Sequence, residues 1–294
     1  MSFRVTQSTT ASVMLQGIET SYDGFETLSS QIASGQAITK PSDNPAGTVQ
    51  VMSYNAELTR LGQYQSNAND GMAWLGTADS VLSSVTTQLQ RVQQLAEQGA
   101  NGTTDATGRA AIANEIDSIK SSLLASANTS YLGRPIFGGT TGGTTAFDTN
   151  GNYVGDSGAV NRTLAPGTSV QVNLVGTDVF GTGPANVFAV LTQLSADLRS
   201  GSASAGTTDL TAVQQAMSQV QTAQATVGSR TNEVQQLLSQ AQARQTTVTE
   251  AKSSVADLDL AKAETELSTQ QLTYEAALQA TSHVLSLSLV QFLQ

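Results

Sequence analysis

A seven-residue repeat of valine in the C-terminal third of the chain is the feature that most constrains its fold. Every seventh position from residue 213 to residue 255 is valine, with alanine once in its place. A heptad of this length lays one apolar stripe along a helix and supercoils that helix against a partner. We therefore predict a helical rod whose core includes Val213, Val220, Val227, Val234, Val248 and Val255.

Two arginines interrupt the inner positions of this repeat, at Arg230 and Arg244. Each lies three residues after a repeat position, where a two-stranded coiled coil needs an apolar side chain. A charged side chain buried without a partner is costly. We therefore expect a larger bundle than a simple pair of helices, or an exposed side at these two points.

An earlier segment carries a matching apolar stripe. From residue 75 to residue 96, apolar residues recur at alternating steps of three and four, which is typical of a helix packed along a partner. Its predicted rod-core residues are Leu75, Leu82, Val85, Leu89 and Val92. Trp74, the only tryptophan, precedes this stripe and is interpreted as a packing residue.

The two ends of the chain also form helices, each with an apolar surface. Near the N-terminus the stripe consists of Leu15, Ile18, Tyr22, Phe25 and Ile32. The last twenty residues are apolar on more than one face, and such a helix must be covered on several sides. One copy of the chain does not supply that cover. We therefore predict that the N-terminal stripe assembles subunits together with Leu278, Leu285, Leu289 and Phe292.

A short segment with two prolines separates the N-terminal helix from the rod. Gly35 follows the last periodic residue, where a helix often ends in a left-handed residue. Asn44 followed by Pro45 predicts an N-cap and the first residue of a new helix. We interpret this segment as an inter-domain joint formed by Pro41, Ser42, Asp43, Asn44 and Pro45.

The middle of the chain changes to a composition rich in glycine and threonine. Asn150-Gly151 is a hairpin signal, and residues 168–176 alternate with a period of two. The predicted fold is mainly α, a long helical rod or coiled-coil bundle built from both ends of the chain, with a small β domain inserted in the middle. We expect three domains: 1–44 with 256–294 as a terminal helical coil, 45–137 with 185–255 as the rod, and 138–184 as the β domain.

Charge and composition exclude several classes of partner. Charged residues make up 12 % of the chain and the net charge is −10. Binding of nucleic acid requires clustered lysine and arginine, and an acidic chain gains nothing from an anionic lipid surface. The chain has no cysteine, no transmembrane segment and no apolar core of a cleaved secretory signal. We therefore expect neither nucleic acid nor a membrane as partner.

No constellation of residues points to catalysis, to a metal site or to a cofactor. His283 is the only histidine and is interpreted as a packing or interface residue. Asp257, Asp259, Glu264 and Glu266 form an acidic stretch without the alternating donors of a calcium loop, so we interpret them as a charged face. Residues 148–152 lack the downstream glutamate of such a loop and predict a hairpin turn.

Three segments near the ends of the chain carry extended motifs. Residues 28–50 read LSSQIASGQAITKPSDNPAGTVQ, residues 227–237 read VGSRTNEVQQL, and residues 261–294 read AKAETELSTQQLTYEAALQATSHVLSLSLVQFLQ. In this order, the three segments resemble the two ends of the bacterial flagellin family. The matched N-terminal positions are Leu28, Ser29, Gly35, Pro41, Ser42, Asp43, Pro45 and Ala46. The middle stretch, YLGRPIFGGTTGGTTAFDTNGNYVGD, resembles the hook–filament junction members of the family more than its filament subunits.

The resemblance implies a structural protein of the extracellular flagellum, exported unfolded without a cleaved signal. Implied partners are further copies of the chain, hook-associated protein 1 on the proximal side and flagellin on the distal side. A cytosolic export chaperone is implied at the C-terminal region. Two alternatives stay open from the sequence: a filament flagellin, and a coiled-coil signalling module similar to a chemoreceptor cytoplasmic region.

Overall fold

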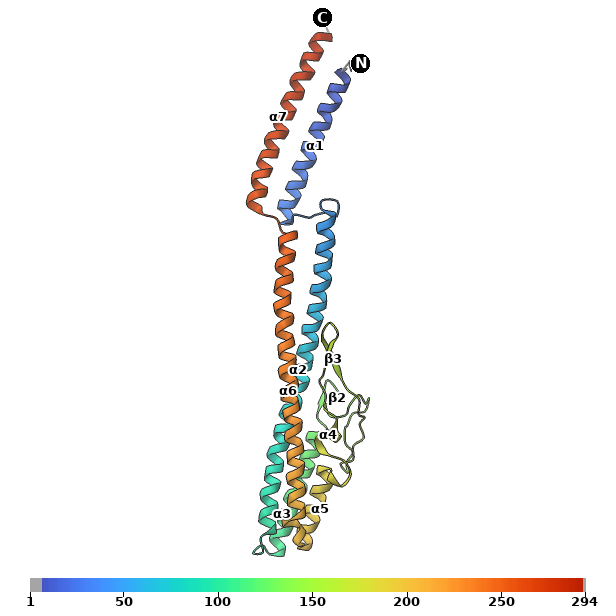
Figure 1. Ribbon diagram of the computed structural model, residues 1–294, viewed down its shortest axis with the longest axis vertical. Helices are drawn as coiled ribbons and strands as arrows, with labels where there is room; N and C mark the ends of the chain where they lie inside the picture. The colour runs from blue at the N-terminus through green and yellow to red at the C-terminus, as the bar shows by residue number, and fades with distance from the viewer. Residues whose placement is uncertain (1–6, 293–294) are drawn as a thin grey trace. The chain divides into compact units, whose positions relative to one another are not determined.

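The computed structural model describes residues 7–292, with side chains from Thr9 to His283 except those of Thr10 and Ala11. The chain divides into two compact units, one formed by Met1–Thr59 with Gln245–Gln294 and the other by Arg60–Arg244. Two long helices, α2 (Pro45–Ala100) and α6 (Thr208–Ala256), contribute to both units (Figure 1). The predicted mainly helical fold is confirmed.

The first unit contains a pair of terminal helices. Helix α1 (Gln7–Ser34) and helix α7 (Leu260–Phe292) lie side by side and antiparallel (Figure 1). The start of α2 and the end of α6 complete this unit. Of the rod-core residues predicted for the end of the heptad, Val248 is buried and Val255 is half-buried, next to the end of α6.

The second unit packs helices around one apolar core. Helices α3 (Ala106–Ala127) and α5 (Val187–Ser200) lie against each other beside α2 and α6. The core contains one stripe of buried side chains on α2 and another on α6. Their fully buried members include Leu75, Leu82, Val85, Leu89 and Val92 on α2, and Val213, Val220, Val227 and Val234 on α6. Trp74 is buried among them and contacts Tyr131 edge-to-face.

The middle of the chain forms two small antiparallel hairpins. Strand β1 (Ser130–Tyr131) pairs with β2 (Arg134–Pro135), and β3 (Asn161–Ala165) pairs with β4 (Thr168–Gln171). The second hairpin pairs Asn161 with Gln171 and Arg162 with Val170, and it contains an irregularity between residues 163 and 165. Helix α4 (Gly176–Phe180) and the short 3-10 helix η1 (Gly183–Ala185) follow the second hairpin, and the hairpins with these two helices are called the β unit below. A second 3-10 helix, η2 (Ala203–Gly206), lies between α5 and α6.

An aromatic cluster packs the middle segment of the chain against α4 and α5. Phe147 contacts Phe180, Phe188 and Tyr153 edge-to-face, with ring centroids 5.3 Å apart in each pair. Phe137 adds a further edge-to-face contact with Phe180. Such pairs contribute about 0.5–1.5 kcal/mol each beyond the apolar area that they bury. These contacts fix the irregular middle segment on the helices without an extended sheet.

Local capping explains where several helices begin and end. Asp105 accepts a hydrogen bond from the amide of Gly108 at 2.7 Å and caps α3, while the Asn186 side chain accepts one from Phe188 at 2.8 Å and caps α5. Gly201, with φ of 73°, ends α5 in a left-handed conformation that favours glycine.

Candidate assembly surfaces and the joint between helices

Side chains from both helices hold the α1–α7 pair together. The Tyr22 and Tyr274 rings lie 5.9 Å apart, and Gln270 donates a hydrogen bond from Nε2 to the Ser21 carbonyl at 2.9 Å. Gly24 lies beside this contact, and a Cβ there would be 2.7 Å from Nε2 of Gln270. The absence of a side chain at Gly24 therefore leaves room for the Gln270 side chain in this position.

The predicted assembly residues divide into covered and uncovered side chains. Ile18, Phe25 and Ile32 are half-buried. In contrast, Leu15 is 57 % exposed, Tyr22 is 50 % exposed and Leu278 is 42 % exposed. The side chains of Leu285, Leu289 and Phe292 lie outside the described residues. The α1–α7 pair thus covers part of the predicted stripe and leaves a substantial apolar part of it to solvent.

Sequence reasoning missed three further exposed apolar residues on the same helices. Val13 is 63 % exposed on α1, and Leu260 and Leu272 on α7 are 52 % and 69 % exposed. Val13 lies two residues before Leu15, and Leu272 lies six before Leu278, so neither falls on the three- and four-residue steps of a stripe. A count of all apolar residues around each helix, instead of one stripe, would have found them.

The segment that follows α1 (residues 35–37) and the segment that follows α6 (residues 256–258) form a short antiparallel ladder within the first unit. The Leu258 amide donates to the Gly35 carbonyl at 3.0 Å, and the Ala37 amide donates to the Ala256 carbonyl at 2.8 Å. Gln36 and Asp257 form the bridge between these two hydrogen bonds. Gly35 has φ of 70°, so the left-handed end of α1 predicted from the sequence is confirmed. The ladder holds the entrance to α2 against the exit from α6.

The turn of the joint is fixed by two side-chain caps. One carboxylate oxygen of Asp43 accepts hydrogen bonds from the Thr39 hydroxyl at 2.8 Å and from the Lys40 amide at 2.8 Å. These bonds lower the pKa of Asp43 below its ordinary value, and the bond from Thr39 has the largest effect. Asn44 accepts from the Gly47 amide at 2.8 Å, and α2 begins at Pro45, so the predicted N-cap is confirmed.

A groove of about 250 Å³, lined by both polar and apolar side chains, lies beside this turn. Ile38 and Pro41 line it from the turn, and Val51 and Met52 line it from the first turns of α2. Met52 and its neighbour Val49 are each 66 % exposed. The joint is therefore also a surface with uncovered apolar side chains, which the sequence reading had not included.

Arg230 connects the rod to the β unit. Its Nη1 donates to the Asn173 carbonyl at 2.6 Å, and its Nη2 donates to the Gln171 side chain at 3.3 Å. Asn173 is fully buried, and its own side chain accepts from the Val160 amide at 2.8 Å. The second inner arginine, Arg244, is exposed. The sequence suggested two ways to accommodate an arginine in the heptad, a larger bundle or an exposed side. Arg230 matches the first, because the β unit packs against it as a third layer, and Arg244 matches the second.

Further polar contacts between α2 and the second hairpin hold the β unit in place. Arg162 on β3 forms an ion pair with Asp70 on α2 at 2.7 Å, and Asn67 donates to the Thr163 carbonyl at 2.9 Å. Within the same unit, Arg199 forms an ion pair with Asp117 at 2.6 Å, which joins α5 to α3.

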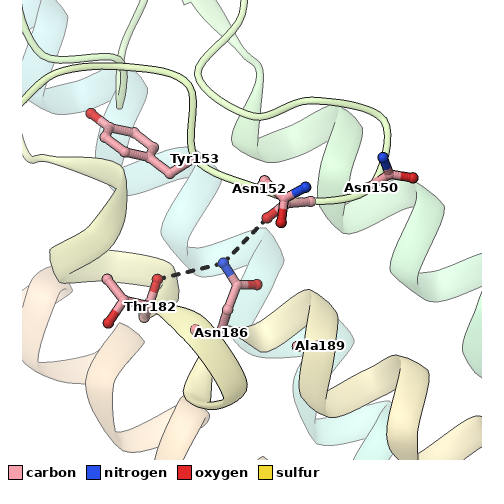
Figure 2. Close-up of a pocket in the computed structure, with 9 residues that line it drawn as sticks. Asn150, Asn152, Tyr153, Thr182, Asn186 and Ala189 are labelled. Carbon is pink, nitrogen blue, oxygen red and sulfur yellow. Dashed lines mark hydrogen bonds between the residues drawn. The ribbon is translucent and has the colours of Figure 1, made fainter.

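Figure 2 shows a small polar pocket between the Asn150 turn and the start of α5. Its volume is about 160 Å³. Asn186 spans one wall, donating from Nδ2 to the carbonyls of Gly151 at 3.2 Å and Gly181 at 3.5 Å. Asp148 accepts from the amides of Asn150 and Asn152 at 2.8 Å each, so the predicted turn is confirmed. Neutral residues line the pocket, and the buried side-chain amide of Asn186 already has hydrogen-bond partners. We therefore interpret the pocket as a structural junction between the turn and α5.

The candidates for chemistry that the sequence offered have structural explanations. Asp259 accepts from the Lys262 amide at 3.2 Å at the start of α7, and Lys262 pairs with Glu266 at 3.7 Å. His283 is exposed. Among the described residues, no group of three or more histidine, aspartate or glutamate side chains is placed to hold a metal ion. Within the same part of the chain, no helix has the length and apolar character needed to cross a bilayer.

Comparison with known proteins identifies the family. The bacterial flagellin N-terminal helical region matches residues 5–141, and the bacterial flagellin C-terminal helical region matches residues 210–293. The chain belongs to the flagellin family, as its two ends suggested, and it is a flagellar structural protein rather than an enzyme.

Individual members of the family are similar to this chain over very different lengths. Flagellar hook-associated protein 3 of Escherichia coli K12 is 26 % identical over 302 residues, which cover 94 % of this chain and 95 % of that protein. The flagellin of Listeria monocytogenes is 39 % identical over 80 residues, covering 27 % of this chain and 28 % of that protein. A solved structure described as a flagellar hook-associated protein of Vibrio parahaemolyticus has the same fold, with a TM-score of 0.68 and 24 % identity over 73 % of this chain and all of that one.

Proposed function

We propose that this chain is the subunit that joins the flagellar hook to the filament. The extent of the similarity supports this assignment over that of a filament subunit. The match to the Escherichia coli hook-associated protein runs through almost the whole of both chains, including the middle segment, whereas the flagellin match is short. The middle segment is also where the junction-like sequence pattern lies.

The observation that carries the mechanism is the uncovered apolar surface of the α1–α7 pair. Leu15, Tyr22 and Leu278 are each 42–57 % exposed although their helices already pack together. Covering the exposed half of such a side chain contributes about 1 kcal/mol. Repeated over several side chains and both neighbours of each subunit, this is enough to couple assembly to ordering of the ends.

In this mechanism, copies of the chain associate through their terminal helices into a ring or short helical layer. Contacts related by a helical rotation join two different surfaces of each copy, as an open tubular assembly requires. Residues 1–44 with 256–294 form the inner tube, 45–137 with 185–255 form the surrounding rod layer, and 138–184 form the β domain. The joint at Pro41–Pro45 sets the connection between the first two.

The partners follow from the same assignment. Hook-associated protein 1 lies on the proximal side of the layer, and flagellin polymerises on its distal side. Before export through the flagellar channel, a cytosolic chaperone binds the apolar C-terminal region and prevents early assembly. The assembled protein is extracellular, at the hook–filament junction.

Deletion of the chain in its host tests this function. We expect cells with hooks but no filaments, and flagellin released into the medium. In the undeleted strain, sheared flagella should contain the chain at low copy relative to flagellin, and gold-labelled antibody should mark the base of each filament. A copy number equal to that of flagellin, with label along the whole filament, would instead identify a filament subunit.

A further inference from the structure

A leucine at the tip of the first hairpin is exposed in an unfavourable backbone conformation. Leu132 has φ of 50° and its side chain is 80 % exposed. Among the described residues, it is the only one other than glycine with a positive φ. The left-handed region is costly for leucine, and an exposed side chain gains no burial in return. Backbone strain of this kind is typical of positions that are kept for binding.

The first hairpin holds Leu132 in a fixed place. The two strands β1 and β2 pair on either side of the turn. The ring of Tyr131 lies 5.6 Å from that of Trp74, which is only 2 % exposed on α2. The chain is therefore anchored to α2 one residue before Leu132, and the leucine side chain extends outward from that anchor.

An apolar pocket lies elsewhere on the same unit, between α2, α6 and the turn of the second hairpin. We call it the hairpin pocket, and its volume is about 160 Å³. Leu61 on α2, Leu164 in β3 and Leu237 on α6 contribute to its walls. Gln240 and Arg244, both exposed on α6, add polar groups to the lining. The pocket is thus a mostly apolar hollow at a surface where three elements meet.

The hairpin pocket has the right size for one aliphatic side chain. An apolar cavity of about 150 Å³ holds a molecule of benzene, and the side chain of leucine has fewer carbon atoms than benzene. A leucine side chain therefore fits the hairpin pocket. Its transfer from water into an apolar site shifts an equilibrium by about tenfold or more.

Leu132 does not reach the hairpin pocket of its own chain. Leu61 precedes Trp74 by 13 residues on α2, which corresponds to about 20 Å along the helix. Because Tyr131 keeps the tip of the first hairpin beside Trp74, one side chain does not span this distance. Strands β2 and β3 also lie at different levels along the helices (Figure 1). A leucine in the pocket must therefore come from another molecule.

The distribution of charge favours a second copy of this chain as that molecule. The net charge is −10, so two copies repel each other unless the surfaces that meet are free of carboxylates. None of the residues that line the hairpin pocket is acidic, and neither is any residue of the first hairpin, residues 130–135. These two surfaces can therefore meet without placing negative charges against each other.

We propose that Leu132 of one copy inserts into the hairpin pocket of the next copy and joins neighbouring subunits of the assembly. The choice of partner rests on the proposed function, which supplies repeated copies of the chain. Leu132 and the pocket are different surfaces of each copy, so the contact continues from subunit to subunit instead of closing on a pair. Between parallel copies, it shifts each subunit along its neighbour by about 20 Å.

Leu132→Asn separates binding from folding, because the two effects have opposite signs. The isolated chain should become more stable, since asparagine tolerates the left-handed region, whereas the contact between copies should weaken. In cells that carry the wild type and a tagged variant together, we expect about tenfold less Leu132→Asn than wild type in sheared flagella. Equal recovery of the two chains would overturn the proposal.

Val154→Asn is the matched control. Val154 is also an apolar residue of the second unit and is 52 % exposed, but it lies outside both the first hairpin and the lining of the pocket. We expect this variant to enter flagella as well as the wild type does. An equal loss of both variants would show that removal of any exposed apolar side chain reduces recovery, and it would overturn the specific role of Leu132.

A pair of cysteines tests the contact directly, because the chain contains no cysteine of its own. With Leu132→Cys and Gln240→Cys in one chain, the contact brings Cα atoms of neighbouring copies within the roughly 7 Å that a disulfide allows. Oxidised flagella should give a ladder of dimers, trimers and larger species on a non-reducing gel. Leu132→Cys with Ser239→Cys should give none, because Ser239 is exposed but does not line the pocket.

The results distinguish a failure of this contact from a failure of the proposed function. If the wild-type chain is absent from sheared flagella, both are wrong. If the wild type and the cysteine variants are recovered but no ladder forms, the contact alone is wrong. A photoreactive amino acid at residue 132 identifies the molecule that it touches by mass spectrometry, and we expect peptides of a second copy that contain residues 61–64 or 237–244. Cross-linking to flagellin instead would overturn the proposal.

Discussion

The backbone amide of Leu258 donates a hydrogen bond to the carbonyl of Gly35 at 3.0 Å, although the two residues lie near opposite ends of the sequence. Together with the bond from Ala37 to Ala256 at 2.8 Å, it joins the connection that leaves α1 to the connection that enters α7. The end of α1 and the start of α7 are therefore held together at one point. A change in either connection is expected to affect both helices.

Substitution of Gly35 tests this joint. Gly35 has φ of 70°, and a Cβ there would meet no atom within 4 Å, so the cost of alanine comes from the backbone alone. We expect Gly35→Ala to lower the free energy of unfolding of the terminal helix pair by about 1 kcal/mol. Urea denaturation followed by circular dichroism at 222 nm measures this change.

Gly17→Ala is the matched control within α1. A Cβ at Gly17 also meets nothing within 4 Å, but this glycine lies inside the helix and has no left-handed φ. Alanine should therefore raise the free energy of unfolding by about 0.5–1 kcal/mol. Equal effects of the two substitutions would show that the left-handed end of α1 is not maintained in solution.

Arg230→Met tests the link between the rod and the β unit. Methionine keeps the apolar length of the side chain but leaves the carbonyl of the buried Asn173 without its donor at 2.6 Å. We expect the free energy of unfolding of the second unit to fall by about 1–3 kcal/mol. Exchange of the Val172 amide, which donates to the Val160 carbonyl, should become faster.

The control for this prediction is Ser229→Ala, an exposed position next to Arg230 on the same helix. It should change the unfolding free energy by less than about 0.5 kcal/mol. If Arg230→Met has as little effect as Ser229→Ala, the arginine does not hold the β unit on the rod.

Leu132→Asn is expected to stabilise the protein. Leu132 forms the tip of the first hairpin with φ of 50°, and its side chain is 80 % exposed. Asparagine tolerates the left-handed region better than leucine, so the free energy of unfolding should rise by up to about 1 kcal/mol. Thermal unfolding would show a higher midpoint.

The neighbouring Gly133, with φ of 77° and open space around its Cβ position, provides the opposite case. Gly133→Ala should lower the free energy of unfolding by about 1 kcal/mol. A stabilising Gly133→Ala or a destabilising Leu132→Asn would mean that the turn has a different conformation in solution.

Much of the rod could be predicted because its causes are local in sequence. The heptads of α2 and α6 repeat at a fixed spacing, and that spacing alone selects the side chains that reach the core, such as Leu82 and Val220. The start of α2 was equally clear, since the Asn44 side chain accepts from an amide within one turn and Pro45 favours the first position of a helix. Such features need no knowledge of the rest of the chain.

The missed features depend on contacts between distant segments. Nothing near Gly35 indicates that its carbonyl accepts from Leu258, and nothing near Arg230 indicates that Asn173 is its partner. The exposed Val49 and Met52 at the joint also escaped notice, because a stripe shows which residues are apolar but not which ones a neighbouring helix covers. Periodicity thus predicts the faces of helices, whereas tertiary contacts decide how much of each face stays open.

Incorporation of Leu15→Glu into flagella tests the proposed assembly most directly. Because Leu15 is 57 % exposed, glutamate should change the stability of the isolated chain by less than about 0.5 kcal/mol. Gln16→Glu, at an exposed neighbouring position, adds the same charge and serves as the control. The measurement is the amount of each variant recovered in sheared flagella from cells that lack the wild-type chain. The account predicts normal recovery of Gln16→Glu and none of Leu15→Glu, while recovery of Leu15→Glu at the wild-type level would contradict it.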